Sequence, residues 1–372
     1  MRIGVPKEIK ILEHRVGLVP SSVKELTVRG HEVFVESGAG EGINFTDSHY
    51  KEVGATIIDS ARDVFDQSDL IVKVKEPQEV EWKMLRPDHV LFTYLHLAAD
   101  PKQATGLIDS GCAAIAYETV TGRNGRGLPL LEPMSEIAGR LSVQVGAYYL
   151  QKHMGGLGRL IGGVPGVKPA EVLILGGGVS GFHAAQMATG LGANVTILEK
   201  SNDRMRYLDD YFHGRANIVY SNTDTLDKAL INADLVIGAV LIPGASAPKL
   251  VRREHLKTMK RGAVMVDIAI DQGGCFETSR ATTHDSPVYT EGGIVHYCVA
   301  NMPGAVPLTS ALALNHSVLP YLLDLLDKGW KEALCGDSNF MAGLNICHGR
   351  CTNRAVAQAL NLSYSDPMEM LS

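Results

Sequence analysis

The sequence lacks the features that mark membrane, secreted and nucleic-acid-binding proteins. It contains no stretch of about 18 uninterrupted apolar residues, which is roughly the length that a transmembrane helix needs. Lysine and arginine total 35 against 41 aspartate and glutamate, so the net charge of −6 offers no basic excess to neutralise phosphates. The first residues, Arg2 to Val5, have the pattern of a strand and not that of a signal peptide. We therefore expect a cytoplasmic protein that binds neither membranes nor nucleic acid.

Cysteine is too scarce to support a disulfide-based fold. Six cysteines in 372 residues do not make a disulfide framework, and we expect reduced thiols. Cys347 and His348, with Cys351, superficially suggest metal ligands. No second pair stands at zinc-site spacing, so no metal is expected.

Length and composition indicate a globular enzyme with more than one domain. A chain of 372 residues is longer than one hydrophobic core usually accommodates, so two domains are the default expectation. A hydrophobic content of 45% and a charged content of 20% are ordinary for such a protein.

A glycine-rich turn in the middle of the chain has the pattern of a dinucleotide-binding motif. The apolar segment 172–175 is followed by Gly176-Gly177-Gly178-Val179-Ser180-Gly181, by an alanine-rich helical segment, and by a second apolar segment that ends at Glu199. The first glycine of such a motif allows a tight turn, the second lets backbone approach the pyrophosphate, and the third lets helix and strand pack closely. The helix N-terminus attracts the phosphates. The alternative is a glycine-rich turn without a ligand, but the carboxylate that ends the next strand favours dinucleotide binding.

Strands alternate with helices on both sides of this turn, which predicts an α/β fold. Before it, strands are expected at residues 3–5, 32–35, 56–58, 70–74, 90–95 and 113–117, and helices at 21–29, 46–53, from 60, 78–85 and from 100. After it, strands are expected at 216–220, 234–240, 263–270 and 294–299, and helices at 225–231 and 252–259. This alternation implies right-handed crossovers and mostly parallel sheets.

Two long helical segments are expected to bridge the domains. One spans residues 130–153, and the other spans 307–328 with a kink expected at Pro320. The glycine-rich stretch 155–169 is interpreted as a loop or linker, with a phosphate-binding role as the less favoured alternative. Beyond residue 330 we expect one helix, 353–360, and a polar end.

The expected fold class is therefore α/β, with two doubly wound, mostly parallel-sheet, Rossmann-like domains and a cleft between them. The predicted substrate domain comprises residues 1–132 and 307–372, and the predicted NAD-binding domain comprises residues 133–306.

Four polar side chains follow strands of these predicted sheets. Arg15 lies in the loop after the first strand, Lys75 and His96 directly follow their strands, and Asp271 follows segment 263–270. Ligands of doubly wound sheets bind outside the carboxyl ends of the strands, so these side chains are candidates for one site. The alternatives are a solvated loop charge for Arg15, an ion pair with Glu76 for Lys75, and a packed, structural histidine for His96. We favour the shared site because a cofactor domain accompanies these residues.

Further motifs occur in order over nearly the whole chain. They are Arg2-Ile3-Gly4-Val5-Pro6-Lys7-Glu8, Lys73-Val74-Lys75-Glu76-Pro77, Leu95-His96-Leu97-Ala98-Ala99, Pro133-Met134-Ser135-Glu136, Asp267-Ile268-Ala269-Ile270-Asp271-Gln272-Gly273-Gly274 and Val299-Ala300-Asn301-Met302-Pro303. In these motifs the sequence resembles the alanine dehydrogenases and their relatives, the nucleotide-binding subunits of proton-translocating transhydrogenase.

The resemblance implies reversible, NAD-dependent oxidative deamination of L-alanine to pyruvate and ammonium, by a homo-oligomer that is commonly a hexamer. By position, Arg15 matches the family's carboxylate-binding arginine and Lys75 its substrate-binding lysine. His96 matches the acid/base histidine, Asp271 the catalytic carboxylate, and Asn301 a position expected near both substrate and nicotinamide. The full set of expected cofactor-binding residues is Ser135, Gly176, Gly178, Val179, Ser180, Gly181, Glu199, Arg204, Ser221, Ile268, Asp271, Asn301 and Met302.

The expected cofactor is NAD, and Glu199 is the residue on which this expectation rests. Relatives often have aspartate here, one methylene shorter, so we expect Glu199 to bind the ribose 2′-OH with shifted geometry. Lys200 and Arg204 lie close in sequence and leave NADP as an alternative. A carboxylate repels a 2′-phosphate dianion, and even about 1.4 kcal/mol changes affinity tenfold, which favours NAD.

Three other functions are compatible with a nucleotide-binding turn. One is a soluble transhydrogenase-type NAD(H)-binding subunit, but this chain has neither a spanning segment nor a long extension leading to a membrane partner. A second is a non-catalytic NAD(H) redox sensor, which gives no reason for four polar candidates at strand ends. A third is a saccharopine-type dehydrogenase, which the motifs match less closely.

Overall fold

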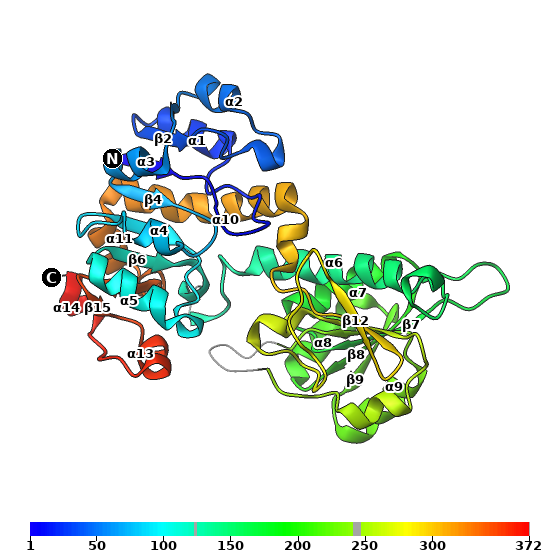
Figure 1. The fold of residues 1–372 in the computed structure, drawn as a ribbon. Helices are drawn as coiled ribbons and strands as arrows, with labels where there is room; N and C mark the ends of the chain where they lie inside the picture. The colour runs from blue at the N-terminus through cyan, green and yellow to red at the C-terminus, as the bar shows by residue number, and fades with distance from the viewer. Residues whose placement is uncertain (123–124, 241–246, 372) are drawn as a thin grey trace. The chain divides into compact units, whose positions relative to one another are not determined.

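The computed structural model describes residues 1–122, 125–240 and 247–371, and these residues form two compact units (Figure 1). The first unit comprises Met1–Met134 with Val306–Ser372, and the second comprises Ser135–Ala305. Each unit is built on a mostly parallel sheet with flanking helices, which confirms the predicted fold class of two Rossmann-like domains. The chain passes from the first unit to the second within helix α6 (Glu132–Tyr149) and returns just before helix α10 (Pro307–Lys328).

The first unit contains an eight-stranded sheet with the strand order β15-β14-β6-β5-β4-β1-β2-β3. Its parallel strands are β1 (Arg2–Val5), β2 (Glu32–Glu36), β3 (Thr56–Ile58), β4 (Leu70–Val72), β5 (Val90–Thr93) and β6 (Ala113–Ala116). Every residue of β4, β5 and β6 is buried, as expected for central strands covered on both faces. All six were predicted to within three residues at either end.

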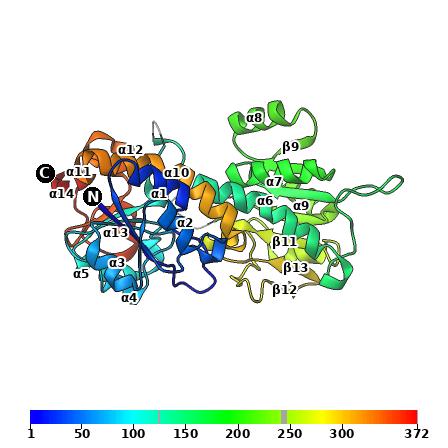
Figure 2. The same cartoon turned by 90° about the horizontal axis from the view of Figure 1, so that it is seen from above.

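The helices of the first unit begin where side chains can bind their free N–H groups. The Ser60 hydroxyl accepts from the Asp63 N–H before α3 (Ala61–Gln67), and the Asp100 carboxylate accepts from the Lys102 N–H before α5 (Pro101–Ser110). The remaining early helices are α1 (Pro20–Thr27), α2 (Asp47–Glu52) and α4 (Glu79–Trp82), the last shorter than the predicted 78–85. Helix α10 runs through Pro320 as one helix, and Figure 2 shows it beside α1, where Asn315 accepts from the Val19 N–H.

The C-terminal region is more structured than the sequence indicated. Besides the expected helix, which is α13 (Arg354–Leu360), it contains α11 (Trp330–Gly336), α12 (Ser338–Met341) and α14 (Pro367–Leu371). It also contributes the hairpin of β14 (Leu344–Cys347) and β15 (Arg350–Cys351), which extends the sheet antiparallel to β6. The expectation of a single helix was wrong, because the region holds three further short helices and a strand, β14, that is defined by pairing with the distant β6.

The second unit contains a seven-stranded sheet with the order β12-β13-β11-β10-β7-β8-β9. Its strands are β7 (Glu171–Leu175), β8 (Asn194–Glu199), β9 (Ala216–Tyr220), β10 (Leu235–Gly238), β11 (Val264–Asp267), β12 (Val288–Glu291) and β13 (Ile294–Tyr297). Strand β12, which pairs antiparallel with β13 at the edge, was not predicted. The strand predicted to reach residue 270 ends at Asp267, and the helix predicted at 252–259 is a short 3₁₀ turn, Arg253–Lys257.

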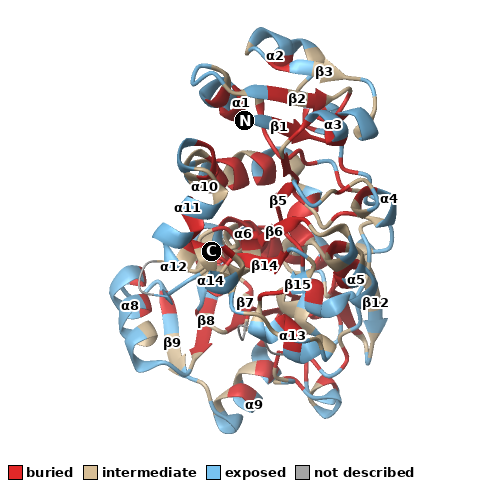
Figure 3. Cartoon of the chain, turned by 90° about the vertical axis from the view of Figure 1, so that its left-hand side faces the viewer, coloured by how far each residue is buried: buried red, intermediate tan, exposed pale blue. Residues whose placement is uncertain are grey.

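Helices α6, α7 (Val179–Gly190), α8 (Asn202–Phe212) and α9 (Thr223–Asn232) flank the second sheet. Helices α6 and α7 lie side by side in Figures 1 and 2, so close that a Cβ on Gly139 would overlap the Ser180 carbonyl oxygen. Figure 3 shows that the buried residues gather on the strands and on the helix faces against them. In the described part of the chain, no helix combines the length and the apolar character needed to cross a bilayer.

Candidate functional site

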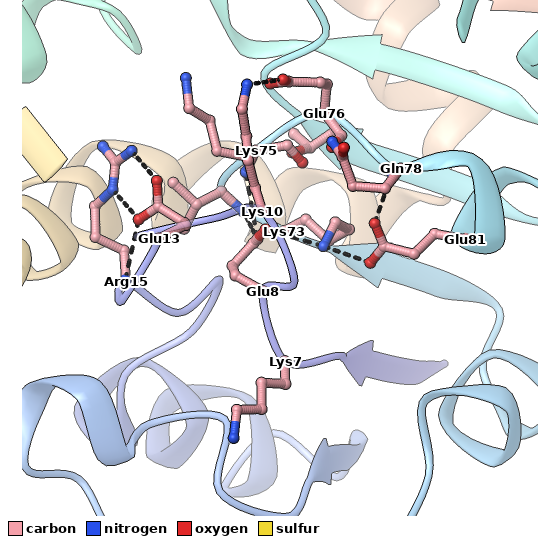
Figure 4. A network of polar contacts seen from close by, with 12 residues as sticks. Lys7, Glu8, Lys10, Glu13, Arg15, Lys73, Lys75, Glu76, Gln78 and Glu81 are labelled. Atoms are coloured by element: carbon pink, nitrogen blue, oxygen red, sulfur yellow. Dashed lines mark hydrogen bonds and ion pairs between the residues drawn. The ribbon is translucent and has the colours of Figure 1, made fainter. Parts of the chain in front are cut away.

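Arg15 is positioned by a carboxylate two residues before it. The Arg15 side chain is only 2% exposed, and its Nε and Nη2 atoms donate to Glu13 Oε1 and Oε2 at 2.6 and 2.5 Å (Figure 4). Its Nη1 lies 3.2 Å from the Met134 sulfur. The alternative of a solvated loop charge is therefore wrong for Arg15, whose Nε–Nη2 edge is bound by Glu13.

The same ion pair controls the ionisation of Glu13. Burial alone would raise the pKa of this carboxyl, but the hydrogen bonds and charge of Arg15, with a smaller effect of Lys75, lower it to about 2. Glu13 thus stays ionised at any physiological pH, and Arg15 and Glu13 together carry no net charge.

Lys75 follows β4 and lies near both Glu13 and Glu76. Burial raises the pKa of the Glu76 carboxyl, but the charges of Lys75 and Lys10 lower it more. The ion pair that Glu76 makes is with Lys10, which Figure 4 shows beside Lys75. Lys75 therefore places a positive charge close to the neutral pair of Glu13 and Arg15.

His96 is held in an unusual backbone conformation after β5. Its φ of 50° lies in the left-handed region, and its side chain is 47% exposed. Glu118, on the short turn after β6, accepts from the His96 N–H at 2.6 Å and lies 3.9 Å from His96 Nδ1. The ring stacks on buried Tyr94, whose hydroxyl donates to the Leu130 carbonyl. His96 is thus a partly exposed, oriented imidazole, and the packed, structural alternative is wrong.

The strand order places these side chains in a row. Strands β1, β4, β5 and β6 are neighbours in one parallel sheet, and Lys75, His96 and Glu118 lie just past the carboxyl ends of the last three. Arg15 lies farther along the loop after β1, where its partner Glu13 comes under the charge of Lys75. The row thus carries two cations, an imidazole and a carboxylate.

The glycine turn of the second unit has the geometry of a phosphate cradle. Gly176 adopts a φ of 93°, and a Cβ on Gly181 would overlap the Gly176 carbonyl oxygen. At Gly178 a Cβ would meet nothing within 4 Å, so the chain itself does not require glycine there. Helix α7 begins at the next residue, with Val179 and Ser180 in its first turn. A dinucleotide fits these features, because glycine at 178 leaves room for a close phosphate and the helix N-terminus attracts it.

Glu199, at the end of β8, is fixed by backbone donors. Its Oε2 accepts from the Gly177 N–H at 2.8 Å, and its Oε1 accepts from the Lys200 and Ser201 N–H groups at 2.7 and 2.9 Å. The Ser221 N–H, just past β9, donates to the Glu199 carbonyl. The carboxylate therefore lies directly against the glycine turn.

Arg204 also contacts the glycine turn. Its Nε donates to the Gly177 carbonyl at 2.5 Å, and its guanidinium lies over the rings of Tyr207 and Phe182 at 4.6 and 5.5 Å. The structure thus places Arg204 against both the turn and an aromatic surface.

Asp271 and Ile268 lie on a 3₁₀ turn, Ile268–Gln272, and not directly at a strand end. The buried Asp267 carboxylate starts this turn by accepting from the Ala269 N–H, and it also accepts from the Cys275 N–H at 2.8 Å. Burial raises the pKa of Asp267, opposed in part by hydrogen bonds from the Ser279 hydroxyl and the Cys275 and Phe276 N–H groups. The turn presents Asp271 to solvent at the carboxyl edge of β11.

The remaining predicted cofactor residues lie near the first and last residues of the second unit in sequence. Asn301 follows β13 with a φ of 62°, and its carbonyl oxygen lies 3.2 Å from His284 Nε2. Met302 is buried at the start of the 3₁₀ turn Met302–Ala305, and Ser135 is the first residue of the unit, within α6. The strand ends of the second sheet therefore carry the glycine turn, Glu199, Ser221, the Asp271 turn and Asn301.

Sequence reasoning missed Glu13, Tyr94 and Glu118. Glu118 follows strand β6 and could have been found by the same strand-end rule that found His96. Glu13 and Tyr94 gave no signal, because only the folded loop brings the carboxylate to Arg15 and only the stacking reveals the ring.

All six cysteines lie in described regions and are free thiols. Within residues 1–122, 125–240 and 247–371, no group of three or more His, Cys, Asp or Glu residues is arranged to hold a metal ion.

Two family models match this chain. The model of the alanine dehydrogenase/PNT N-terminal domain matches residues 4–138, and that of the C-terminal domain matches residues 142–354. An alanine dehydrogenase of Halomonas elongata is 53% identical over 371 residues, and one of Mycolicibacterium smegmatis is 51% identical over 372 residues, each match covering 100% of both chains.

Solved structures agree with these matches. A structure titled L-alanine dehydrogenase has a TM-score of 0.94 at 51% identity, covering 97% of this chain and 99% of that one. A transhydrogenase from Sinorhizobium meliloti has a TM-score of 0.81 at 26% identity, covering 95% of this chain and 100% of that one.

Proposed function

We propose, from the premise that this chain belongs to the alanine dehydrogenase/PNT family, that it catalyses the NAD-dependent, reversible oxidative deamination of L-alanine to pyruvate and ammonium. The full-length identity with named alanine dehydrogenases confirms the resemblance seen in the motifs. The observation that carries the proposal is the row of Arg15, Lys75 and His96 at the carboxyl ends of three neighbouring strands.

The two cations of the row are suited to a 2-oxo or 2-amino acid. In this proposal Arg15 binds the substrate carboxylate through its Nη1 and Nη2 atoms, because Glu13 binds the Nε edge. Glu13 neutralises Arg15, so Lys75 supplies the net positive charge that attracts the carboxylate and polarises the developing carbonyl.

His96 is suited to moving protons near neutral pH. Bound NAD supplies a hydride acceptor; after Cα has lost hydride, the resulting imine takes up water and releases ammonia. The addition of water to the imine and the loss of ammonia from the resulting carbinolamine both require proton transfer. An imidazole is the side chain that most often performs such transfers. We assign this transfer to His96, oriented by Glu118, and we assign Asp271 to orienting the water or stabilising cationic intermediates. Asn301 is proposed to contact both substrate and nicotinamide.

We propose NAD and not NADP as the cofactor. The Glu199 carboxylate is bound by three backbone N–H groups beside the glycine turn, which keeps a negative charge where a 2′-phosphate would lie. Arg204 donates to the carbonyl oxygens of the turn, so we propose that it stabilises the turn and also contacts the cofactor. Ser135, Ser221, Ile268 and Met302 complete the proposed cofactor contacts.

We also propose that the first unit is the substrate domain and the second the NAD-binding domain. The free thiols suit the cytoplasm as the compartment, and family resemblance suggests a homohexamer. Light scattering of the purified protein tests the proposed number of subunits.

A transhydrogenase-type NAD(H)-binding subunit is the second candidate, favoured by the structural similarity to the Sinorhizobium meliloti transhydrogenase. Absorbance of NADH distinguishes the two, with small L-amino acids plus NAD in one direction and 2-oxo acids plus ammonium in the other. The proposal predicts turnover with alanine and pyruvate and no need for a partner protein. No turnover with either substrate would leave the transhydrogenase-type role as the better account.

A further inference from the structure

A buried carboxylate that the proposed reaction does not use lies against the backbone of Lys75. Glu8 is in the loop that leaves β1, and its side chain is 1% exposed. Its Oε1 accepts from the Val74 and Lys75 N–H groups at 2.7 and 3.3 Å, and its Oε2 accepts from Lys73 Nζ at 3.0 Å (Figure 4). Glu8 thus contacts three consecutive residues, the last of which is Lys75.

These contacts replace part of the sheet. Strands β1 and β4 pair at Ile3 with Leu70 and at Gly4 with Ile71, but β1 ends at Val5. Past Val5 the two strands no longer pair. There the Glu8 carboxylate accepts from the Val74 and Lys75 N–H groups, in the place that a β1 carbonyl oxygen would take in a longer strand. The backbone leading to Lys75 is therefore held by the Glu8 side chain through its Val74 and Lys75 N–H groups, and by Tyr94 and Thr93 through its carbonyl oxygens.

Lys73 is the counter-ion of this carboxylate. Its ammonium is completely buried and lies 2.7 Å from Glu81 Oε1 as well as 3.0 Å from Glu8 Oε2. Glu81 in turn accepts from the Gln78 N–H at the start of α4. Burial raises the pKa of Glu8 although Lys73 opposes it. Apolar side chains would often stabilise a core as well as these buried charges do. We therefore interpret the charges as serving to position the backbone that they contact.

The loop that carries Glu8 is also the loop that carries Arg15. Seven residues after Glu8, Arg15 forms its pair with Glu13, and the charge of Lys75 acts on that same Glu13 carboxyl. A contact that fixes the Lys75 backbone against this loop therefore also fixes the spacing between the two cations.

We propose that Glu8 is a positioning residue that holds the Lys75 backbone in register with Arg15, with Lys73 and Glu81 as its buried support. The proposal rests on the proposed function, in which Lys75 and Arg15 bind the substrate. It assigns Glu8 no contact with the substrate.

The test compares two variants that differ at one side chain. Both carry Lys73→Met and Glu81→Gln, which remove the other buried charges, while the new amide oxygen at position 81 keeps an acceptor for the Gln78 N–H. One adds Glu8→Gln, whose amide oxygen still accepts from the Val74 and Lys75 N–H groups, and the other adds Glu8→Leu, which cannot accept. Steady-state kinetics with pyruvate, ammonium and NADH give KM and kcat, and NADH fluorescence gives the cofactor Kd.

The Glu8→Gln protein should keep a pyruvate KM near that of the wild type, and Glu8→Leu should raise it by about 10- to 100-fold, the scale expected when a binding group is misplaced. The NADH Kd should be the same in both. Adding Lys75→Ala to each should abolish the difference between them. Equal pyruvate KM values in the two proteins, or a difference that persists without Lys75, would overturn the proposal.

Two further measurements keep the test decisive. If Glu8→Leu does not fold, the single variant Glu8→Asp, which keeps the charge but is too short to reach both N–H groups, should still raise the pyruvate KM. Amide hydrogen exchange at Val74 and Lys75 should stay slow in the Glu8→Gln protein and become fast in the Glu8→Leu and Glu8→Asp proteins, whether or not the protein turns over. A wild type without turnover refutes the proposed function, and unchanged exchange refutes the role of Glu8.

Discussion

The carboxylate of Glu13 binds the Nε and Nη2 atoms of Arg15 through both of its oxygens, in the interior of the first unit. An arginine held in this way has one orientation, and the pair as a whole is neutral. In the proposed function the substrate carboxylate binds the Nη1–Nη2 edge, and Lys75 supplies the net positive charge. The predictions below follow from this arrangement and from the glycine turn.

Replacing Arg15 should weaken pyruvate binding without affecting NADH. Because Arg15→Met alone removes the guanidinium that the buried Glu13 carboxylate binds, the informative comparison is Glu13→Gln/Arg15→Met against Glu13→Gln. Hydrogen bonds to charged groups contribute about 1.5–3 kcal/mol, so the pyruvate KM should rise roughly 10- to 100-fold. Steady-state kinetics at saturating NADH measure this. An unchanged pyruvate KM would show that Arg15 does not bind the carboxylate.

Glu13 should make the stability of the first unit depend on acid pH. Its pKa is about 2 in the folded chain against 4.5 for an ordinary glutamate, so its contribution is present above about pH 4.5 and is lost as pH falls towards 2. The shift of about 2.5 pKa units corresponds to on the order of 3 kcal/mol. Urea unfolding between pH 3 and pH 6 should show this slope in the wild type and a shallower slope in Glu13→Gln. Parallel slopes would contradict the pairing with Arg15.

His96→Asn should reduce turnover and leave NADH binding intact. Asparagine tolerates the left-handed backbone that His96 adopts, so the substitution removes the imidazole without straining the turn. A positioned acid/base group accelerates a reaction by roughly 10²- to 10⁴-fold. The kcat of the variant should therefore be lower than that of the wild type by a factor in this range at every pH. Turnover within a few-fold of the wild type would assign the proton transfer to another residue.

Gly178→Ala should separate cofactor binding from folding. A Cβ at Gly178 meets no atom of the chain within 4 Å, and the φ of −62° suits alanine, so the Tm should not fall. If the phosphates approach the backbone here, NADH affinity should fall tenfold or more, which is about 1.4 kcal/mol. Gly190→Ala, also without neighbours, is the matched control that should keep full affinity. Unchanged affinity in Gly178→Ala would place the pyrophosphate elsewhere.

Glu199→Gln should narrow the preference for NAD over NADP. The substitution removes the negative charge, so the repulsion of a 2′-phosphate is lost, and its amide oxygen can replace one of the two carboxylate oxygens that accept from the neighbouring backbone. The ratio of kcat/KM for NAD to kcat/KM for NADP should fall by about tenfold or more. A ratio equal to that of the wild type would contradict the ribose assignment.

Much of this fold could be read from the sequence because its strands are short apolar runs separated by helices. Both sheets follow that pattern. The strand ends also indicated candidate site residues, of which His96 and Lys75 lie within three residues of a strand. The antiparallel strands β12, β14 and β15 were missed. Strand β14 pairs antiparallel with β6, which is distant in sequence and leaves no local pattern. Strands β12 and β13 form a hairpin across Gly292-Gly293, a local turn signal in the sequence that we overlooked.

The acidic partners of the site were hidden for a related reason. Glu8, Glu13 and Glu118 are carboxylates in loops, where sequence patterns predict solvation. Burial and pairing with Lys73, Arg15 and the His96 backbone arise only in the folded unit. The cations of the site could thus be predicted from the sequence, whereas the groups that orient them required the structure.

The most direct test of the account is the fate of the hydrogen on the substrate Cα. L-Alanine deuterated at Cα is incubated with NAD and the purified protein, and the products are analysed by mass spectrometry and NMR. The account predicts pyruvate, ammonium and NADH in equal amounts, with one deuterium in each NADH. Absence of pyruvate, or NADH formed without deuterium, would contradict it.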